Sequence, residues 1–249
     1  MTSRFFAKRA HQLALAIVVL GVPQSALLAE PRSLDDPVRL TLTAEDVRAS
    51  NEEAAAAYGA LVSMWTNALR PLGVRFVAPR FVRYRGATRT ACGVMPASNA
   101  VYCFNNNTIY FDDVFLAGQT KLTGHALDTD GDMAAVGIIA HEMGHAVAMQ
   151  LGFRSRISYE NEAVADCLAG AFARQAKADG SLEDGDLDEA FHAMAAAGDP
   201  ELRPTGDRRL DRRRAAVLAR EGHGTRDQRM QNFRNGLNGG GRACLEELG

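Results

Sequence analysis

The sequence His141-Glu142-Met143-Gly144-His145 places two imidazoles four residues apart inside an apolar segment, Ala134–Leu151. Apolar residues recur at three- and four-residue spacing from Val136 to Val147, which predicts a helix. Both imidazoles then leave one face of this helix and can bind one tetrahedral Zn²⁺, while Glu142 beside them can accept a proton from water. The segment predicts a zinc site. The alternative is a helix whose two histidines share a face without binding a ligand.

A second predicted helix carries the carboxylates that such a site requires. Glu162 and Asp166 lie one turn apart on its face. Two histidines leave zinc without a third protein ligand, and a carboxylate on a neighbouring helix can provide it. We therefore expect His141, His145 and Glu162 to bind the metal. We expect Asp166 to orient a histidine through its other ring nitrogen. The alternative, two solvated surface acids, is mildly repulsive at this spacing.

The two segments resemble the gluzincin arrangement of thermolysin-type zinc peptidases, with Asn161-Glu162 and Asp166 following the histidine motif. The metzincin pattern does not fit, because its Gly and His positions hold Ala148 and Leu151. More closely, the chain resembles the bacterial putative neutral zinc metallopeptidase family over about residues 50–246. Besides the zinc helix, the matching pieces are Ala91-Cys92-Gly93, Val101-Tyr102-Cys103, Thr108–Asp112, Ala165–Gly170, His223-Gly224-Thr225 and Gln228-Arg229.

This resemblance implies an α+β zincin-like domain, with a small mixed sheet that has an edge strand and a mostly helical C-terminal part. It implies a zinc-dependent peptidase with one Zn²⁺ per chain and a peptide or protein substrate. Glu142 would take the proton of the attacking water and pass it to the leaving amine. One departure is Phe104, which stands after the second motif cysteine where the family has a proline; it affects only the local turn.

Two further roles remain open at this point. His223 is the first candidate for donating a hydrogen bond to the carbonyl oxyanion, because it precedes a helix start in a shared segment. Tyr159 and His192 are weaker candidates, and each of the three could be satisfied elsewhere instead. Thr108–Asp112 has the place in chain order of an edge strand that pairs with the substrate backbone, or it is a covered internal strand.

A second class of function is also compatible with these residues. The chain could be an exported, zinc-stabilised binding or chaperone-like module without turnover. A purely structural zinc site normally has four protein ligands, so the free Glu142 favours an enzyme.

The N-terminal segment Met1–Ala29 has the pattern of a secretory signal. Three basic residues precede the apolar stretch Leu13–Val22, and small residues follow at Ala26–Ala29. We expect an exported protein, periplasmic or secreted, whose residues 30–249 form a single domain. An uncleaved segment would instead anchor the protein to the membrane, and membrane contact is expected only in that case.

The charge balance restricts the partners. Without residues 1–29 the chain has 25 basic and 30 acidic residues, a net charge of −5. This balance argues against nucleic acid or an anionic membrane as the main partner. The arginine cluster from Arg208 to Arg214 alternates with acids, which favours a solvated helix face, with a binding patch as the alternative.

Four cysteines follow the signal segment, and an even count in an exported protein suggests two disulfides. Four cysteines allow three pairings. Cys92 and Cys103 flank a predicted turn, which favours a bridge between them, and Cys167 would then join Cys244. The alternative is buried free thiols, which would argue for a cytosolic protein.

The other expected elements are less directly tied to the site. Gly144 inside the zinc helix suggests a close approach of another chain segment. Before the zinc helix we expect a helix from Thr43 to Leu69, strands at Val74–Tyr84, Val101–Phe104 and Thr108–Phe111, and a loop at Gly118–Asp132. After it we expect a helix that begins with a capping box of Asp186 and Glu189. A last helix follows Thr225, and its apolar stripe, which includes Phe233, is expected to lie in the core.

Overall fold

Helix α1 (Ala44–Leu69) is the first element of a computed structural model that describes residues 41–199 and 202–246. The expected signal segment, Met1–Ala29, lies outside these residues. Thr43 and Asp46 form the expected capping box, in which each side chain bonds to the backbone N–H of the other. The helix ends at Leu69, as expected, and a 3-10 turn, η2 (Arg70–Leu72), follows it and is terminated by Gly73 in a left-handed conformation with φ of 73°.

The main sheet is mixed, as expected, and small. Its strand order is β1-β5-β4, with β5 parallel to β1 and antiparallel to β4. Of the two alternatives left open for Thr108–Asp112, the structure shows the internal strand, because this segment is central and pairs on both sides. β1 and β4 are the two edge strands, and β4 is the one next to the zinc helix. The bounds are β1 Arg80–Tyr84, β4 Ala100–Cys103 and β5 Thr108–Asp112, and a separate hairpin consists of β2 Thr88–Thr90 and β3 Gly93–Met95.

The segment after the sheet is a helix, α2 (Asp113–Leu127), where a loop was expected at Gly118–Asp132. Asp112, the last residue of β5, caps this helix by accepting hydrogen bonds from the backbone of Val114 and Phe115. The loop prediction rested on the polar, glycine-bearing composition of this segment and was wrong for most of it. A Cβ at that position would meet the carbonyl oxygen of Thr129 at 2.8 Å, so this glycine serves packing inside a helix.

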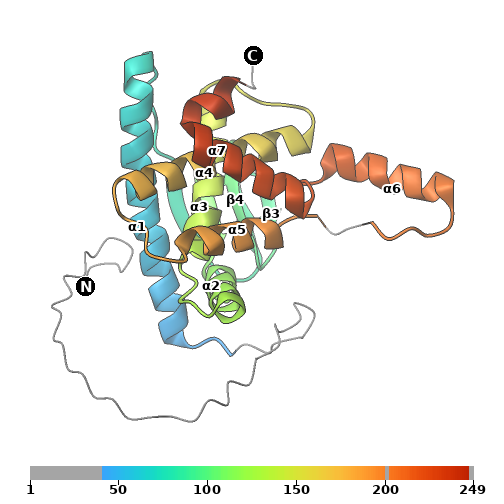
Figure 1. Cartoon of the computed structure of the whole chain (residues 1–249), viewed down its shortest axis with the longest axis horizontal. Coiled ribbons are helices and arrows are strands. Elements are labelled where there is room, and N and C mark those ends of the chain that lie inside the picture. Colours follow the sequence, from blue (N-terminus) through green and yellow to red (C-terminus); the bar gives the residue numbers. More distant parts are fainter. Residues whose placement is uncertain (1–40, 200–201, 247–249) are drawn as a thin grey trace, which may run out of the picture.

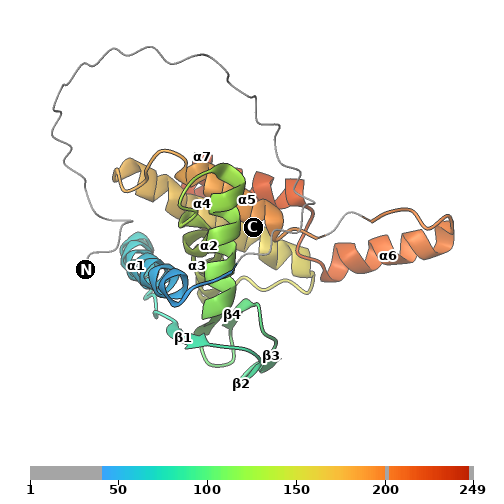
Figure 2. The same ribbon diagram turned by 90° about the horizontal axis from the view of Figure 1, so that it is seen from below.

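Helix α3 (Met133–Gln150) carries the histidine motif and lies at the centre of the molecule, with most of its side chains buried. Figure 2 shows the strands on one side of α3 and helices α4, α5 and α7 on the other. Gly144 is the expected point of close approach, because a Cβ there would lie 2.7 Å from the carbonyl oxygen of Ala165 in α4 (Ser158–Ala178). This contact brings the two site-bearing helices together.

Helix α7 (Arg226–Glu246) packs along α4 more extensively than any other pair of described elements. Glycines allow the approach, because a side chain at Gly170 would overlap the carbonyl oxygen of Phe233 and one at Gly236 that of Cys167. Phe233 is buried in the hydrophobic core, as expected. The helical C-terminal part is therefore built around the α4–α7 pair (Figure 1).

Helix α5 (Asp186–Ala196) lacks the expected capping box. Its first turn follows Gly185, which makes no side-chain cap hydrogen bond. Instead, the buried carboxylate of Glu189 accepts hydrogen bonds from the backbone N–H groups of Gly131 and Met133, at the start of α3. The motif therefore caps a neighbouring helix rather than its own, which is a tertiary contact that local spacing does not reveal.

Helix α6 (Arg208–Glu221) stands apart from the other helices in both views of the molecule (Figures 1 and 2). Asp207 caps its start by accepting hydrogen bonds from the N–H groups of Arg209 and Leu210. Within residues 41–199 and 202–246, none of the helices has the length and apolar character needed to cross a membrane.

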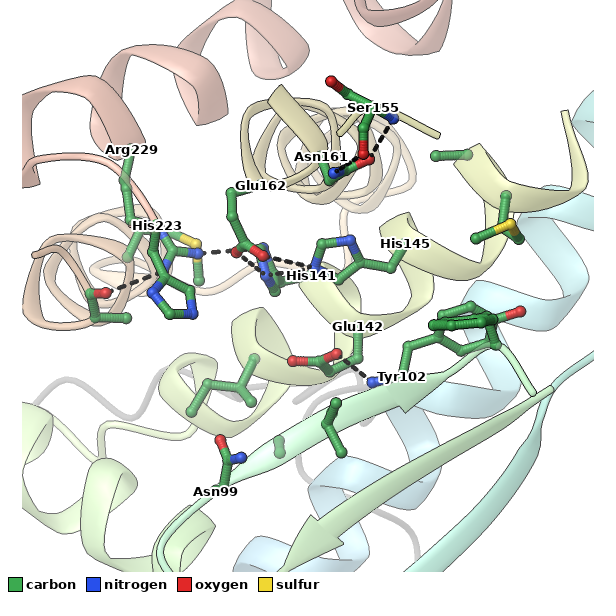
Figure 3. A pocket seen from close by; sticks show the side chains of 18 of the residues that line it. Asn99, Tyr102, His141, Glu142, His145, Ser155, Asn161, Glu162, His223 and Arg229 are labelled. Atoms are coloured by element: carbon green, nitrogen blue, oxygen red, sulfur yellow. Dashed lines mark hydrogen bonds and ion pairs between the residues drawn. The ribbon is translucent and has the colours of Figure 1, made fainter. Parts of the chain in front are cut away.

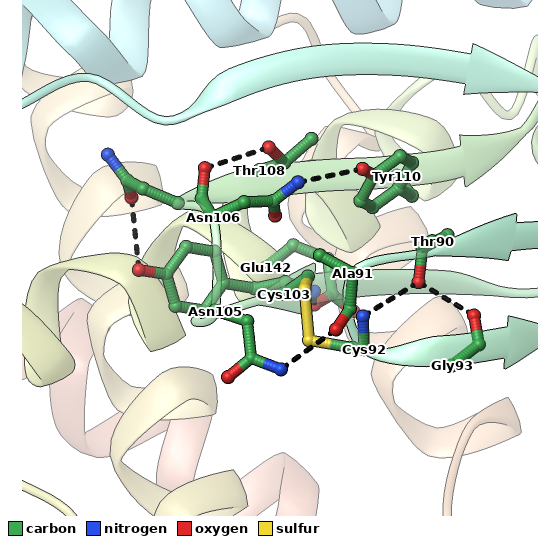
Figure 4. Close-up of a disulfide and its surroundings, with 12 residues drawn as sticks. Thr90, Ala91, Cys92, Gly93, Cys103, Asn105, Asn106, Thr108, Tyr110 and Glu142 are labelled. Carbon is green, nitrogen blue, oxygen red and sulfur yellow. Dashed lines mark hydrogen bonds between the residues drawn. A yellow bond between two sulfur atoms is a disulfide. The ribbon is translucent and has the colours of Figure 1, made fainter.

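Two disulfides are present, with the pairing that the sequence favours. Cys92, in the turn between β2 and β3, is joined to Cys103, the last residue of β4 (Figure 4). Cys167 joins Cys244 and so ties α4 to α7, across a sequence separation of 77 residues. No cysteine of the described residues is free. Two structural disulfides fit an exported protein in an oxidising compartment.

Candidate active site

Three side chains from α3 and α4 converge on one point. The Nε2 atoms of His141 and His145 are 3.1 Å apart. The Glu162 carboxylate places one oxygen 3.1 Å from Nε2 of His141 and the other 3.4 Å from Nε2 of His145. Figure 3 shows Glu162 reaching from α4 toward both imidazoles. Among the described residues, these three form one of two groups whose ligand atoms lie within 4.8 Å of one another.

These separations fit a single tetrahedral metal ion. Ligand atoms that are each 2.0–2.1 Å from a tetrahedral zinc lie about 3.3–3.4 Å from one another, close to the spacing found here. Oε2 of Glu162 is buried and has no hydrogen-bond partner, although it lies 3.1 Å from Nε2 of His141. Nitrogen and carboxylate ligands of this kind suit Zn²⁺. The residues therefore fit the metal expected from the sequence.

Asp166 contacts the first histidine, which it was expected to orient. Its Oδ1 lies 2.8 Å from Nδ1 of His141, and its side chain is fully buried. A carboxylate can only accept a hydrogen bond, so the His141 proton is on Nδ1. When Nε2 gives up its proton, its lone pair is directed at His145 and Glu162. The lone pairs of a neutral imidazole and a carboxylate then face the same point, where a cation is favourable.

Arg229 of α7 completes this arrangement, and the sequence did not assign it a role. Its guanidinium donates two hydrogen bonds to Asp166 and one to the carbonyl of Ala197. It also lies 3.2 Å from Nδ1 of His141. The pairing with Asp166 joins residues 63 positions apart, so no local spacing could have revealed it. Its place in a segment shared with the family was the one available signal.

Protons and a metal compete for the same atoms at this site. Burial and the charge of Arg229 act to lower the pKa of His141, but the close contacts with the carboxylates of Asp166 and Glu162 outweigh them and raise it to about 10. Burial acts to raise the pKa of Glu162, and the close contacts with His141 and His145 reverse this and lower it. Metal binding must therefore displace a proton, which makes it pH-dependent.

Glu142 lies beside the metal-binding group and contacts the edge strand. It is 7% exposed, and its Oε2 accepts a hydrogen bond from the backbone N–H of Tyr102 in β4 at 2.6 Å (Figure 3). This hydrogen bond fixes the orientation of the Glu142 carboxylate beside the two histidines. The sequence did not reveal this contact, because it joins residues 40 positions apart.

A cavity of about 610 Å³ opens above these groups. β4 forms one wall, and the opposite side is formed by α3 and the start of α4. Near one end Arg154 lies over the ring of Phe104, with 4.2 Å between the guanidinium carbon and the ring centroid. The remaining lining is largely apolar and includes Phe115, Ile138, Met149, Phe153 and Met194. The cavity is large enough for several residues of an extended peptide.

The three candidates for an oxyanion donor lie in different places. His223 lines the cavity, and its Nδ1 lies 3.6 Å from Oδ1 of Asp199. Its side chain is 59% exposed and so can turn toward a ligand. His192 is directed at Thr123, and Tyr159 packs beside Gly224. Neither of the latter is among the described residues that line the cavity.

Comparison with known proteins agrees with this geometry. The family model described as "Putative neutral zinc metallopeptidase" matches residues 11–247. A protein of Escherichia coli strain K12, described as "Uncharacterized protein YpfJ", is 31% identical over 220 residues, which cover 80% of this chain and 73% of that relative. The same values hold for the protein of that description in Escherichia coli O6:H1. No solved structure matches the chain.

Proposed function

The chain belongs to the putative neutral zinc metallopeptidase family, and we propose that it is a zinc-dependent peptidase that hydrolyses peptide bonds. The observation that carries this proposal is the convergence of His141, His145 and Glu162 beside the separate carboxylate of Glu142. Three protein ligands leave a fourth position for water or substrate, which is typical of catalytic rather than structural zinc sites.

In this proposal His141, His145 and Glu162 hold the metal. A zinc ion there supplies a Lewis acid that lowers the pKa of bound water to about 7 and polarises the scissile carbonyl. Glu142 accepts the proton of the attacking water and later donates it to the nitrogen of the leaving amine. Asp166 holds the reactive tautomer of His141, and His223 donates a hydrogen bond to the oxyanion that develops on the substrate.

The edge strand β4 is the proposed docking surface for the substrate backbone. Residues of a strand point their N–H and C=O groups alternately to the two sides. The N–H of Tyr102 points away from β5, toward Glu142, so the N–H and C=O of Ala100 also point outward. An extended peptide that pairs there would lie along the cavity, with its backbone next to the proton-accepting carboxylate.

An exported location accompanies this proposal. The signal pattern in the sequence and the two disulfides both support a periplasmic or secreted protein. Natural substrates would then be peptides or proteins outside the cytoplasm.

Cleavage of an unfolded protein of mixed sequence tests the proposal. The zinc-loaded chain from residue 30 onward should cleave it, and Glu142→Gln should lower the rate by about 10² to 10⁴-fold with the zinc content unchanged. Glu52→Gln, on the exposed face of α1, is the matched control and should cleave normally.

Two other outcomes would contradict the proposal in different ways. Zinc bound to both proteins without cleavage by either would favour a zinc-stabilised module that has no turnover. Absence of zinc from the wild-type protein, after purification without chelator, would show that the three-residue group is not a metal site.

A further inference from the structure

Helix α6 has no described residue in the buried class, unlike the helices around it. Its main contact with the rest of the described molecule is with α4. Isolated helices shorter than about 12–15 residues are marginal in water, because most helical stability in proteins comes from packing of one face. A projecting helix of 14 residues is therefore a good candidate for an element that packs against something outside the chain.

The charge of α6 is opposite to that of the remaining protein. The helix has six arginines and two acidic residues, a net charge of +4, whereas the whole chain has −2, which leaves −6 on the rest. At 100° per residue, five of the arginines fall within a sector of about 140° that contains no acid. These five, called here the arginine face, are Arg208, Arg209, Arg212, Arg213 and Arg220.

An apolar ridge borders the arginine face. Leu210 and Val217 are seven positions apart and so lie on the same side of the helix, next to Arg213. Their side chains are 45% and 56% exposed. A helix with a strongly basic face, low overall hydrophobicity and a few exposed aliphatic side chains is typical of segments that lie in a membrane interface.

We propose that α6 is a membrane-docking arm that binds the surface of a bilayer containing anionic phospholipids. The guanidinium groups of the arginine face bind lipid phosphates, often through two hydrogen bonds each. Leu210 and Val217 enter the boundary between headgroups and acyl chains. The net charge of the whole chain argued against such a partner, but the charge is segregated and α6 alone is basic.

The base of α6 lies beside the proposed active site. Asp199, which precedes the arm, and Gly224, which follows it, are joined by two hydrogen bonds, one between their backbones and one to the Asp199 side chain. His223, which lines the cavity, contacts the same Asp199. Docking of α6 would therefore place the cavity close to the membrane surface. The docking itself does not depend on the proposed peptidase activity.

Co-sedimentation with lipid vesicles tests the arm. The chain from residue 30 onward retains every residue that the structure describes and lacks the apolar N-terminal stretch, which could bind lipid by itself. We expect it to bind vesicles of phosphatidylcholine with 40% phosphatidylglycerol at low salt and not vesicles of phosphatidylcholine alone. Because each basic residue near an anionic surface contributes about 1 kcal/mol, replacing Arg208, Arg209, Arg212 and Arg213 by Gln should weaken binding at least about 100-fold.

A variant with the same change in charge elsewhere provides the control. Arg75, Arg80, Arg89 and Arg242 are exposed arginines outside α6, and replacing all four by Gln should leave at least half of the affinity. Circular dichroism of both variants reports whether the fold is kept, and glutamine retains high helix propensity. Equal loss of binding in the two variants would overturn the assignment to α6.

Two further results would also overturn the proposal. One is failure of the wild-type chain to bind anionic vesicles at low salt. The other concerns the apolar ridge: Leu210→Ser with Val217→Ser should weaken vesicle binding. If this variant binds vesicles normally, and the wild type binds the soluble polyanion heparin as tightly as vesicles, the arginine face would serve a soluble polyanion rather than lipid.

Discussion

Arg229 donates to both carboxylate oxygens of Asp166, with 3.1 Å from Nε to Oδ2 and 2.6 Å from Nη2 to Oδ1. The two side chains are 3% and 0% exposed, so this ion pair is shielded from water. Asp166 uses Oδ1 for His141 as well. One buried carboxylate thus links α3, α4 and α7, and its negative charge is balanced before any metal binds.

Arg229→Gln should lower the free energy of unfolding by about 3–5 kcal/mol, because it removes one partner of a buried ion pair and its two hydrogen bonds to Asp166. Urea denaturation measures the change. Arg174→Gln is the control, since Arg174 is exposed and bonds only to the carbonyls of Leu237 and Asn238. If both variants lose the same free energy of unfolding, the buried ion pair stabilises the protein no more than the exposed contacts of Arg174 do.

Asp166→Asn should weaken zinc binding by about 10–100-fold, because the amide can no longer act as an anionic acceptor that fixes the His141 tautomer. Competition with a chromophoric chelator measures the affinity. Asp179→Asn, at the exposed end of α4, should bind zinc like the wild type. If Asp166→Asn binds zinc as tightly as the wild type, Asp166 does not support the metal-binding histidine.

Gly144→Ala should destabilise the protein by about 1–3 kcal/mol, although alanine favours helices. The added Cβ would lie 2.7 Å from the carbonyl oxygen of Ala165, and only a shift between α3 and α4 could relieve this contact. Gly59→Ala in α1 is the matched control, since a Cβ there has no atom within 4 Å and should stabilise the helix by up to about 1 kcal/mol. Thermal unfolding of both variants compares the two effects, and stabilisation by Gly144→Ala would contradict the close packing.

Asp132, before the start of α3, should make stability depend on pH. Burial, together with the charges of Asp130 and Asp186, raises the pKa of its carboxyl group to about 8, and its Oδ1 is buried without a hydrogen bond. The folded protein therefore binds this proton more tightly than the unfolded chain, so stability falls as pH rises from about 4 to about 8.

Asp132→Asn should remove this part of the pH dependence. It should raise the free energy of unfolding at pH 8 by about 1–3 kcal/mol and change it little at pH 4. Urea denaturation at several pH values gives both curves. Parallel curves for the wild type and the variant would show that Asp132 titrates normally in the folded protein.

The two disulfides should contribute unequally. Loss of Cys167–Cys244 removes a closed loop of 77 residues, whereas Cys92–Cys103 closes one of 11. On the chain-entropy account the longer loop contributes about 4–5 kcal/mol and the shorter about 3 kcal/mol. Paired Cys→Ala variants compared by urea denaturation test this order. A larger loss from the Cys92–Cys103 pair would point to enthalpic effects instead.

Local pattern was sufficient for the chemistry-bearing helices. The spacing of His141 and His145, and of Glu162 and Asp166, follows from helix periodicity, and the structure brings His141, His145 and Glu162 together. The capping pair Thr43 and Asp46 was equally local. These features depend on neighbours within one or two turns, so one sequence contains what is needed to find them.

The errors concern contacts between distant segments. The place of β5 in the sheet was left open, because sequence order does not determine order within a sheet. Glu189 was expected to cap its own helix and caps α3 instead. The polar, glycine-bearing segment Gly118–Asp132 was expected to be a loop, but at Gly124 the glycine accommodates the carbonyl of Thr129, which the turn between α2 and α3 brings near.

The pairing of α4 with α7 has a consequence for biosynthesis. Translation proceeds from the N-terminus, so His141, Glu142, His145 and Glu162 are made before Arg229 and Cys244. A nascent chain that ends before α7 carries every proposed ligand and the proposed base. Asp166 then lacks its ion-pair partner Arg229, and Cys167 lacks its disulfide partner Cys244. The two links between α4 and α7, the Asp166–Arg229 ion pair and the Cys167–Cys244 disulfide, therefore form only after the last helix has been made.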